Sequence, residues 1–406
     1  MDFSWTEEQE KWRQTVREFA QKEIKPRVRD IDTNARIPDD IIKGMAKLGL
    51  LGLTVSPDYG GAGTDWKMAC IAAEELGRAD ISIAVPVLYL VEASWGFILD
   101  RYGTKEAKAE ILPKMVNGDV FLGIATTEPD GGSDIVGATK TTAKKDGNNW
   151  KLKGKKIYIS GVAESLKYGG IYLTLAKTEP EKEYKGMSFF GVTLKDNPNI
   201  STTIFKNMGR MGISTGGFTM DDISIPEAFL VGELNRGFYY AMEGFSLART
   251  LIAATCIGAA EAGMEIGIDY IKQRKAFNRP IASYEGIQFP LVEHYTNIEA
   301  IKLLTYRAAW LLDKMYKEGE SNHFEIAKQT AMAKLKASTE AFNTLNEVSN
   351  WLGTLAYIAG CPIEIGVRGV RSYSIGAEGA TNIMKLIIAR ELLGKEFLPY
   401  KVWPGE

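Results

Sequence analysis

The sequence is poor in the residues that most often bind metals or form disulfides. Its 406 residues include two histidines and three cysteines. Cys70, Cys256 and Cys361 are isolated and form no CxxC pair, which argues against a zinc site and against a disulfide framework. With so little histidine, we expect carboxylates and a bound cofactor to carry any reaction.

The sequence also lacks an excess of charge of either sign. Its formal net charge is -2, and lysine and arginine are spread along the chain, so we expect no basic face for nucleic acid. The first eight residues lack the basic and then apolar profile of a signal peptide, and no uninterrupted apolar run reaches the length of a membrane span. These absences predict a cytoplasmic protein that has no membrane span and binds no nucleic acid.

The composition is that of ordinary globular protein, with 45% hydrophobic and 25% charged residues. A chain of this length can form two or three domains around a large core. Residues 1–120 show apolar residues at helical spacing, interrupted by a loop rich in glycine and proline at residues 57–63. This spacing predicts an N-terminal domain made of helices.

The hydrophobic period changes to two in residues 121–232. Strands are predicted at 152–159 and 171–175, and Asp146-Gly147 predicts a hairpin turn. We expect the lysines of residues 140–156 on the solvated side of this hairpin rather than in a phosphate site. The helical period returns in residues 233–406, and helices as long as those predicted there usually pack as a bundle.

A carboxylate beside a glycine precedes the last amphipathic segment. Ile383, Leu386 and Ile387 recur near helical spacing, which predicts a helix that begins at residue 380 or 381. Glu378 then lies just before the positive end of that helix. On this pattern alone, Glu378 fits either an ordinary helix-end acid or a catalytic base.

The order of helices, β domain and helices resembles the acyl-CoA dehydrogenase family almost from end to end. Five motifs in the same order carry the resemblance: Gly49–Gly52 with Pro57–Gly63, Thr127–Asp134, Gly154–Ser160, Arg274–Phe277 with Pro280-Ile281, and Glu378–Arg390. The resemblance implies an α+β fold with three domains. They are an N-terminal all-α domain (1–120), a middle antiparallel β-barrel or sandwich domain (121–232) and a C-terminal four-helix bundle (233–406).

The resemblance also implies a reaction and a cofactor. The reaction is the FAD-dependent α,β-dehydrogenation of an acyl-CoA thioester to the 2-enoyl-CoA, with electrons passed to an electron-transferring flavoprotein. Glu378 would take the α proton, and flavin N5 would take the β hydride. Some family members carry the base immediately before the arginine that corresponds to Arg249. In this chain that position is Ala248. Of the two base positions known in the family, only that of Glu378 therefore holds a carboxylate.

Further site residues follow from the resemblance alone. Those expected to contact FAD are Thr126, Thr127, Tyr158, Ser160, Arg274, Phe277, Asn350, Gly353 and Asn382. Those expected to contact the acyl-CoA are Ser133, Phe245, Arg249 and Gly379. Arg274 and Phe277 would reach the FAD of a neighbouring subunit, which implies a homo-oligomer, usually a tetramer.

The chain departs from the family pattern near the predicted base. The usual glycine-rich run reads Asn350–Tyr357 and keeps only Gly353, while Ala377 and Ala380 replace an aromatic residue and a threonine. The two small residues widen the pocket and remove a hydroxyl, which leaves open an enoyl-CoA reductase or a cyclic or aromatic acyl group. The altered glycine-rich run leaves open a non-catalytic acyl-CoA-binding homologue. The length of the acyl chain also stays open.

The apolar segment from Ile81 to Leu99 is expected to contribute to the floor of the substrate pocket. Tyr89 and Glu92 are its polar exceptions, and either could meet the far end of a substrate. For Glu92, we favour a position on a solvated helix face.

Overall fold

The computed structural model describes residues 4–320 and 322–399, which belong to two compact units. Unit 1 combines the N-terminal segment up to Arg29, residues 66–83 and the chain from Ser246 onward. Unit 2 combines residues 30–65 and 84–245. In chain order, helices precede a β-sheet and helices follow it, so the predicted fold class is confirmed. The boundaries at 120 and 232 stay predictions, because the compact units divide the chain at other positions.

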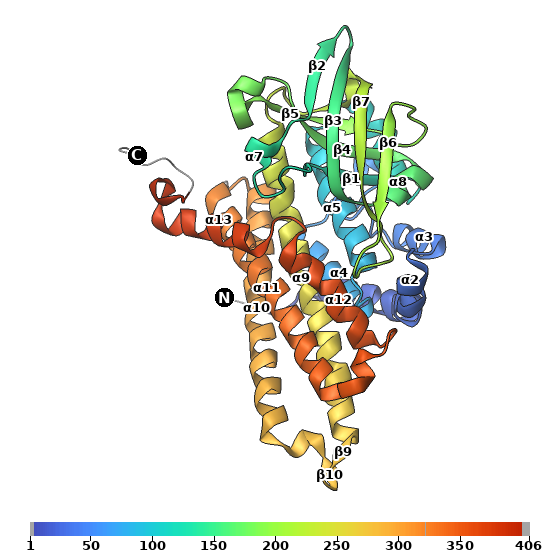
Figure 1. Cartoon of the computed structure of the whole chain (residues 1–406), viewed down its shortest axis with the longest axis vertical. Coiled ribbons are helices and arrows are strands. Elements are labelled where there is room, and N and C mark those ends of the chain that lie inside the picture. The colour runs from blue at the N-terminus through green and yellow to red at the C-terminus, as the bar shows by residue number, and fades with distance from the viewer. Residues whose placement is uncertain (1–3, 321, 400–406) are drawn as a thin grey trace. The chain divides into compact units, whose positions relative to one another are not determined.

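Unit 2 is built on an eight-stranded sheet, which Figure 1 shows in green. Its strands are β1 (Phe121–Ala125), β2 (Thr142–Asp146), β3 (Asn149–Ser160), β4 (Gly170–Lys177), β5 (Met187–Val192), β6 (Ile200–Phe205), β7 (Thr215–Pro226) and β8 (Leu230–Val231). The order is β6-β7-β3-β2-β4-β5-β8, with β1 beside β4. The pairs β1–β4 and β2–β4 are parallel and the others are antiparallel.

The predicted hairpin connects β2 to β3. The register pairs Asp146 with Asn149, so Gly147 and Asn148 form a two-residue loop. Gly147 has φ +58°, a left-handed conformation that suits glycine in the tight turns of β-hairpins. Local turn chemistry therefore set the register of this strand pair.

Helices cover the remainder of unit 2. Their bounds are α3 (Asp39–Lys47), α5 (Ala84–Tyr102), α6 (Lys105–Val116), α7 (Ile135–Ala138) and α8 (Val162–Tyr168), and α2 (Val28–Asn34) begins at the end of a unit 1 segment. Helix α5 is buried along nearly all of its length and contacts β1. It is therefore a core helix without a broad solvated face.

The expectation that Glu92 faces solvent is wrong. This side chain of α5 is only 2% exposed, and its Oε1 accepts a hydrogen bond from the Leu122 backbone N–H at 3.2 Å. Its Oε2 is buried and has no hydrogen-bond partner among the described residues. Burial raises the pKa of Glu92 well above its usual value, because the ionised carboxylate would lose its hydration there. Tyr89, on the same helix, is fully buried.

Glu92→Gln is expected to stabilise the protein increasingly as pH rises above the usual pKa of a glutamate. Because folding raises the pKa of Glu92, wild-type stability falls as the unfolded chain ionises while the folded chain holds its proton. Glutamine has no proton to lose and keeps the oxygen that accepts from Leu122. Thermal unfolding at about pH 5 and pH 8 measures the effect, and an equal change of melting temperature at both would contradict it.

Unit 1 contains the long helices of the C-terminal region. They are α9 (Gly237–Gln273), which belongs to unit 1 from Ser246, α10 (Glu285–Glu318), α11 (His323–Leu352), α12 (Pro362–Ile375) and α13 (Thr381–Leu393), and they are joined by α1 (Glu7–Phe19) and α4 (Trp66–Ala79). Figure 1 shows α9, α10 and α11 running lengthwise beside one another. Close approach at two glycines of α9, Gly263 against Leu345 and Gly267 against Trp351, packs α9 on α11.

Helix α9 is long and apolar enough to cross a membrane by length and composition. However, 78% of its most apolar window is buried inside the structure. The burial identifies α9 as a core helix, and its apolar residues are explained by packing.

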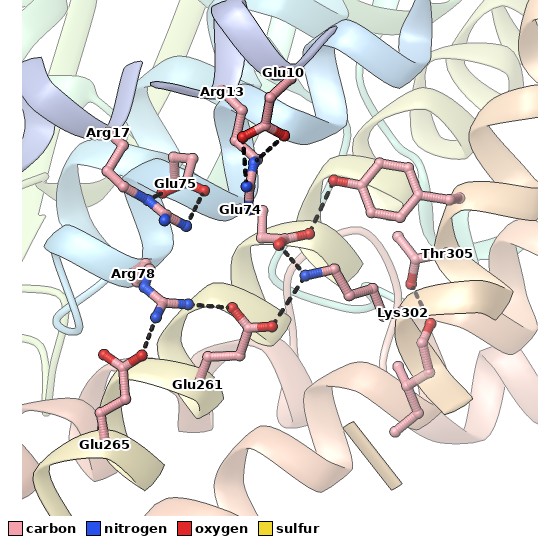
Figure 2. Close-up of polar contacts among 12 residues, drawn as sticks. Glu10, Arg13, Arg17, Glu74, Glu75, Arg78, Glu261, Glu265, Lys302 and Thr305 are labelled. Carbon is pink, nitrogen blue, oxygen red and sulfur yellow. Dashed lines mark hydrogen bonds and ion pairs between the residues drawn. The ribbon is translucent and has the colours of Figure 1, made fainter. Parts of the chain in front are cut away.

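Charged side chains link α1, α4, α9 and α10 within unit 1 (Figure 2). Lys302 of α10 donates to Glu74 at 2.5 Å and to Glu261 at 3.1 Å, and the Tyr306 hydroxyl donates to Glu74 at 2.9 Å. Arg78 donates to Glu261 at 2.6 Å. Burial raises the pKa of Glu74 to about 7 despite the neighbouring lysine. The network therefore contains a carboxyl that titrates near neutrality.

Candidate active site

Glu378 lies in the short segment that joins α12 to α13. Helix α13 begins at Thr381, within the predicted limits, and its N-cap residue Ala380 makes no side-chain hydrogen bond. The first N–H groups of α13 thus carry their partial positive charge without a capping side chain. Glu378 has φ +55° and Gly379 has φ +103°. The left-handed region is uncommon for a residue with a side chain, so Glu378 is conformationally strained.

Two buried cations bind the backbone of this segment. Arg249 Nε, on α9, donates to the Glu378 carbonyl oxygen at 2.8 Å. Lys334 Nζ, on α11, donates to the carbonyl oxygens of Gly379 at 2.6 Å and Tyr373 at 2.5 Å. Helices α9, α11, α12 and α13 therefore meet at the predicted base. The structure brings together three predicted site residues, which are Arg249, Glu378 and Gly379.

Burial shifts the pKa of both cations. It lowers the pKa of Arg249 to about 10 and that of Lys334 to about 8. The negative charge of Glu378 opposes the shift in each case. The carboxylate of Glu378 thus offsets part of the desolvation of both cations, whereas the charge of Arg249 lowers the pKa of Lys334 further.

Four predicted cofactor residues lie at the other end of the bundle. Arg274 directly precedes β9 (Lys275–Ala276), and Phe277 lies between β9 and β10 (Arg279–Pro280), with 92% of its surface exposed. Asn350 is in the last turn of α11, and Gly353 is the C-cap of that helix. Figure 1 shows the β9–β10 hairpin at the end of the α9 and α10 helices.

The distance along α9 separates these residues from Glu378. Arg249 contacts Glu378, and Arg274 follows Arg249 by 25 residues. At about 1.5 Å per residue, the two positions are roughly 37 Å apart along the helix. The structure therefore does not bring Arg274 and Phe277 together with Glu378 in one chain. Asn382 lies exposed in the first turn of α13, close to Glu378 in sequence.

Residues 126–128 of unit 2, which include the predicted FAD contacts Thr126 and Thr127, are hydrogen-bonded to β3. Lys156 Nζ donates to the Thr126 carbonyl oxygen at 3.1 Å and to Glu128 Oε1 at 2.7 Å. The Ile157 backbone N–H donates to the Thr127 carbonyl oxygen at 3.0 Å. Glu128 also accepts from the backbone N–H groups of residues 140 and 141. The loop that carries Thr126 and Thr127 is thus held by hydrogen bonds to β3 and to residues 140 and 141.

The expectation that the lysines of residues 140–156 face solvent is wrong for Lys156, which is fully buried. Burial lowers its pKa to about 8. Although burial opposes it, the charge and hydrogen bonds of Lys156 hold the pKa of Glu128 below its usual value. The pair is therefore ionised at neutral pH. A buried ion pair is retained only where its geometry satisfies both partners, as it does here.

Tyr158 and Ser160 of β3 offer groups that suit a flavin. Tyr158 has φ +59° and is 67% exposed, and its ring lies 5.7 Å from that of Phe205. An exposed aromatic face on a strand can stack against a planar ring system. Ser160 Oγ accepts from Arg210 at 3.1 Å and keeps its own O–H for donation. Together with the fixed Thr126–Thr127 loop, these residues fit the expected FAD.

The two remaining predicted contacts of unit 2 differ in exposure. Ser133 is exposed in the loop before α7. Phe245 is 6% exposed, and its ring meets Trp95 edge-on with centroids 5.5 Å apart. The structure therefore gives Phe245 a role in core packing.

Comparison with known proteins gives the family. The chain matches three family models of the acyl-CoA dehydrogenases. They are the N-terminal domain over residues 6–119, the middle domain over residues 123–223 and the C-terminal domain over residues 235–393. The chain belongs to the acyl-CoA dehydrogenase family. Members of this family are FAD-dependent oxidoreductases that act on the CH–CH bond of acyl-CoA thioesters, so the predicted family and cofactor are confirmed.

Relatives in this family cover nearly the whole chain. An acyl-CoA dehydrogenase of Bacillus subtilis is 36% identical over 96% of this chain and 99% of its own length. A 3-(aryl)acrylate reductase of Clostridium sporogenes is 35% identical over the same shares. The solved butyryl-CoA dehydrogenase of Megasphaera elsdenii superposes with a TM-score of 0.87 at 27% identity, covering 97% of this chain and all of that one. The dehydrogenase and the reductase, which are named for opposite directions of reaction, are thus about equally similar to this chain.

Sequence reasoning missed two buried lysines beside predicted site residues. Lys334 lies on the buried face of α11 with Thr330, Ala337 and Ala341, at helical spacing. A lysine on such a face is a signal, because a buried ammonium needs fixed acceptors. For Lys156, the alternation of β3 was the corresponding signal, since Leu152 and Lys156 are buried on this strand.

Proposed function

We propose that this protein catalyses the FAD-dependent α,β-dehydrogenation of an acyl-CoA thioester with Glu378 as the base. The observation that carries the proposal is the segment around Glu378, a strained carboxylate residue before an uncapped helix end, with its carbonyl bound by Arg249. A general base must be held in a fixed direction within hydrogen-bond reach of the proton that it removes. The over-determined backbone at Glu378 and the hydrogen bond from Arg249 both hold the carboxylate in one direction.

The residues of this chain would divide the work. Glu378 removes the α proton, while Arg249 holds its backbone. Thr126, Thr127, Tyr158 and Ser160 hold the flavin ring, and FAD when bound supplies the two-electron acceptor for the β hydrogen. Within each unit these groups are held by fixed contacts, Glu378 through Arg249 and the Thr126–Thr127 loop through β3, and holding a reacting group in place lowers the entropic part of the barrier.

Reduction of an enoyl-CoA is the second candidate. It is favoured by the 35% identity to a 3-(aryl)acrylate reductase, the same level as to an acyl-CoA dehydrogenase. In this direction a protonated Glu378 would give its proton to the α carbon, since the two directions pass through the same transition state. The small residues Ala377 and Ala380 beside Glu378 also suit a bulky acyl group.

A panel of thioesters tests both directions. The purified protein, reconstituted with FAD, is mixed anaerobically with straight-chain, branched and aryl-substituted acyl-CoAs, and flavin absorbance is followed. Bleaching by at least one acyl-CoA is the expected result. In the reverse assay, chemically reduced flavin is reoxidised by the matching enoyl-CoAs. A protein that takes up no FAD, or whose flavin responds to neither panel, would instead be a non-catalytic acyl-CoA-binding homologue.

The electron partner is tested in the same assay. We propose an electron-transferring flavoprotein as the acceptor in the dehydrogenase direction. Adding one with an acyl-CoA that bleaches the flavin is expected to give steady turnover, followed as reduction of the added flavoprotein. Bleaching without turnover would contradict this partner.

We also propose that the protein is a homo-oligomer, with a tetramer as the expected form. Arg274 and Phe277 lie roughly 37 Å along α9 from the base region, so an FAD that they contact would belong to another subunit. Exposed apolar side chains of unit 1 give such a contact a surface. They are Phe277, Phe289, Val292, Tyr295, Leu355, Tyr357 and Ile358. Light scattering on the eluted protein measures the state, and a monomer would contradict the proposal.

A further inference from the structure

The segment from Tyr373 to Gly379 needs external support. Its two consecutive left-handed residues, Glu378 and Gly379, lie between the end of α12 at Ile375 and the start of α13 at Thr381. A residue with a side chain keeps such a conformation only when its surroundings over-determine it. The question is which contacts do so.

Lys334 contacts both ends of this segment. Its ammonium donates to the carbonyl oxygen of Tyr373 at 2.5 Å, in the last turn of α12, and to that of Gly379 at 2.6 Å, just before α13. The side chain is fully buried, and Tyr373 is buried as well. One side chain thus fixes the distance between the two ends of the segment that carries Glu378.

We infer that Lys334 is a positioning residue. By binding carbonyl oxygens at both ends of the α12–α13 segment, it sets the direction of the Glu378 carboxylate. The inference rests on the proposed function, in which Glu378 is the base. Lys334 and Arg249 divide the segment between them, because Arg249 binds the carbonyl of Glu378 and Lys334 binds those on either side.

The chemistry of Lys334 supports a role beyond filling space. A methionine of similar length would pack in the same position without the cost of desolvating a charge. Only a group with several N–H donors can bind two carbonyl oxygens at once. A side chain that merely packed α11 against α12 would not need either property.

Lys334→Met removes the donors and nearly keeps the volume. With the acyl-CoA that best bleaches the wild type, the rate of flavin reduction at saturating substrate is expected to fall by about 10²-fold, the effect of misplacing a catalytic group by about 1 Å. Binding of the acyl-CoA is expected to change little, because the hydrogen bonds of Lys334 to the base segment go to its backbone carbonyl oxygens. Lys334→Gln keeps one amide donor group and is expected to recover part of the rate.

Ser338→Ala is the matched control. Ser338 is buried one turn along α11, and its hydroxyl donates to the Lys334 carbonyl oxygen of the same helix at 2.8 Å. It is expected to lower the melting temperature slightly and to leave the rate unchanged. A loss of rate in Ser338→Ala as large as that in Lys334→Met would show that general packing of α11 is responsible, which overturns the inference.

Hydrogen–deuterium exchange gives a readout that is independent of activity. In Lys334→Met or Lys334→Gln, as purified and without added substrate, the amides of residues 374–382 are expected to exchange faster than in the wild type, while those of α10 stay protected. A wild-type rate of flavin reduction in Lys334→Met, or unchanged exchange in both variants, overturns the inference. If no acyl-CoA bleaches the wild type, the proposed function fails, whereas the exchange measurement still tests the contact.

Discussion

Glu378→Gln is expected to lower the rate of flavin reduction by acyl-CoA by about 10²–10⁴-fold, the contribution of a general base. Glutamine has nearly the same shape, so the contacts of Arg249 and Lys334 with the segment backbone are kept. Its amide cannot accept the α proton. FAD content and acyl-CoA affinity are therefore expected to stay close to those of the wild type.

Two further measurements sharpen this result. In deuterated water, the wild type is expected to exchange the α hydrogen of a bound thioester, and Glu378→Gln is expected not to. Glu378→Asp keeps a carboxylate but withdraws it by one methylene, so its rate should lie between the two. Near-normal bleaching by Glu378→Gln would show that the base is another residue.

The control for Glu378→Gln is Glu364→Gln. Glu364 is a partly buried carboxylate of α12 that forms an ion pair with Arg368 one turn away. Its substitution changes the charge of the same helix pair without touching the base segment. It is expected to leave the flavin reduction rate unchanged. A matching loss in this variant would mean that the net charge of the region, rather than Glu378 itself, controls the rate.

Local signals predicted well what local chemistry determines. The start of α13 at Thr381 followed from apolar spacing, and the β2–β3 turn followed from Asp146-Gly147. Both depend on a few neighbouring residues. The position of Glu378 before a helix end could therefore be predicted from the sequence, as could the three-part order of the fold.

Features that depend on distant residues could not be predicted in the same way. Helix α5 is apolar nearly all round, so its sequence has no polar face that would indicate where Glu92 points. Lys334 reaches carbonyls 39 and 45 residues away. Lys156 meets Glu128 across 28 residues. A buried charge in a sequence shows that a partner is needed, but only the tertiary structure identifies the partner.

Lys302→Met is expected to destabilise unit 1 by about 3–5 kcal/mol at pH near 8.5, the usual cost of breaking a buried ion pair. Lys302 lies between Glu74 and Glu261, as Figure 2 shows, and Tyr306 and Arg78 bind the same two carboxylates. Without the ammonium, the buried Glu74 faces Glu261 with no cation between them. Like charges in a poorly solvated place repel strongly.

The loss is expected to grow with pH. In the wild type, burial raises the pKa of Glu74 to about 7, so stability falls as pH rises from the usual glutamate value to about 7 and levels off above it. Lys302 lowers that pKa, and its removal raises it further. The variant therefore continues to lose stability above pH 7, where the wild type no longer does. The pKa of Lys302 is itself raised despite burial, through Glu74 and Glu261, so its charge is constant across this range.

Thermal unfolding between about pH 5.5 and 8.5 measures both the loss of stability and its dependence on pH. Lys302→Met combined with Glu74→Gln is expected to recover stability at the higher pH, because the carboxyl that lost its partner is then neutral. Arg13→Ala is the control, since the Glu10–Arg13 pair in Figure 2 lies one turn apart on α1 and is partly exposed, and ion pairs that reach water contribute little. A loss of equal size at both pH values would contradict the electrostatic account, because it would mean that the methylene chain of Lys302 contributes through packing alone.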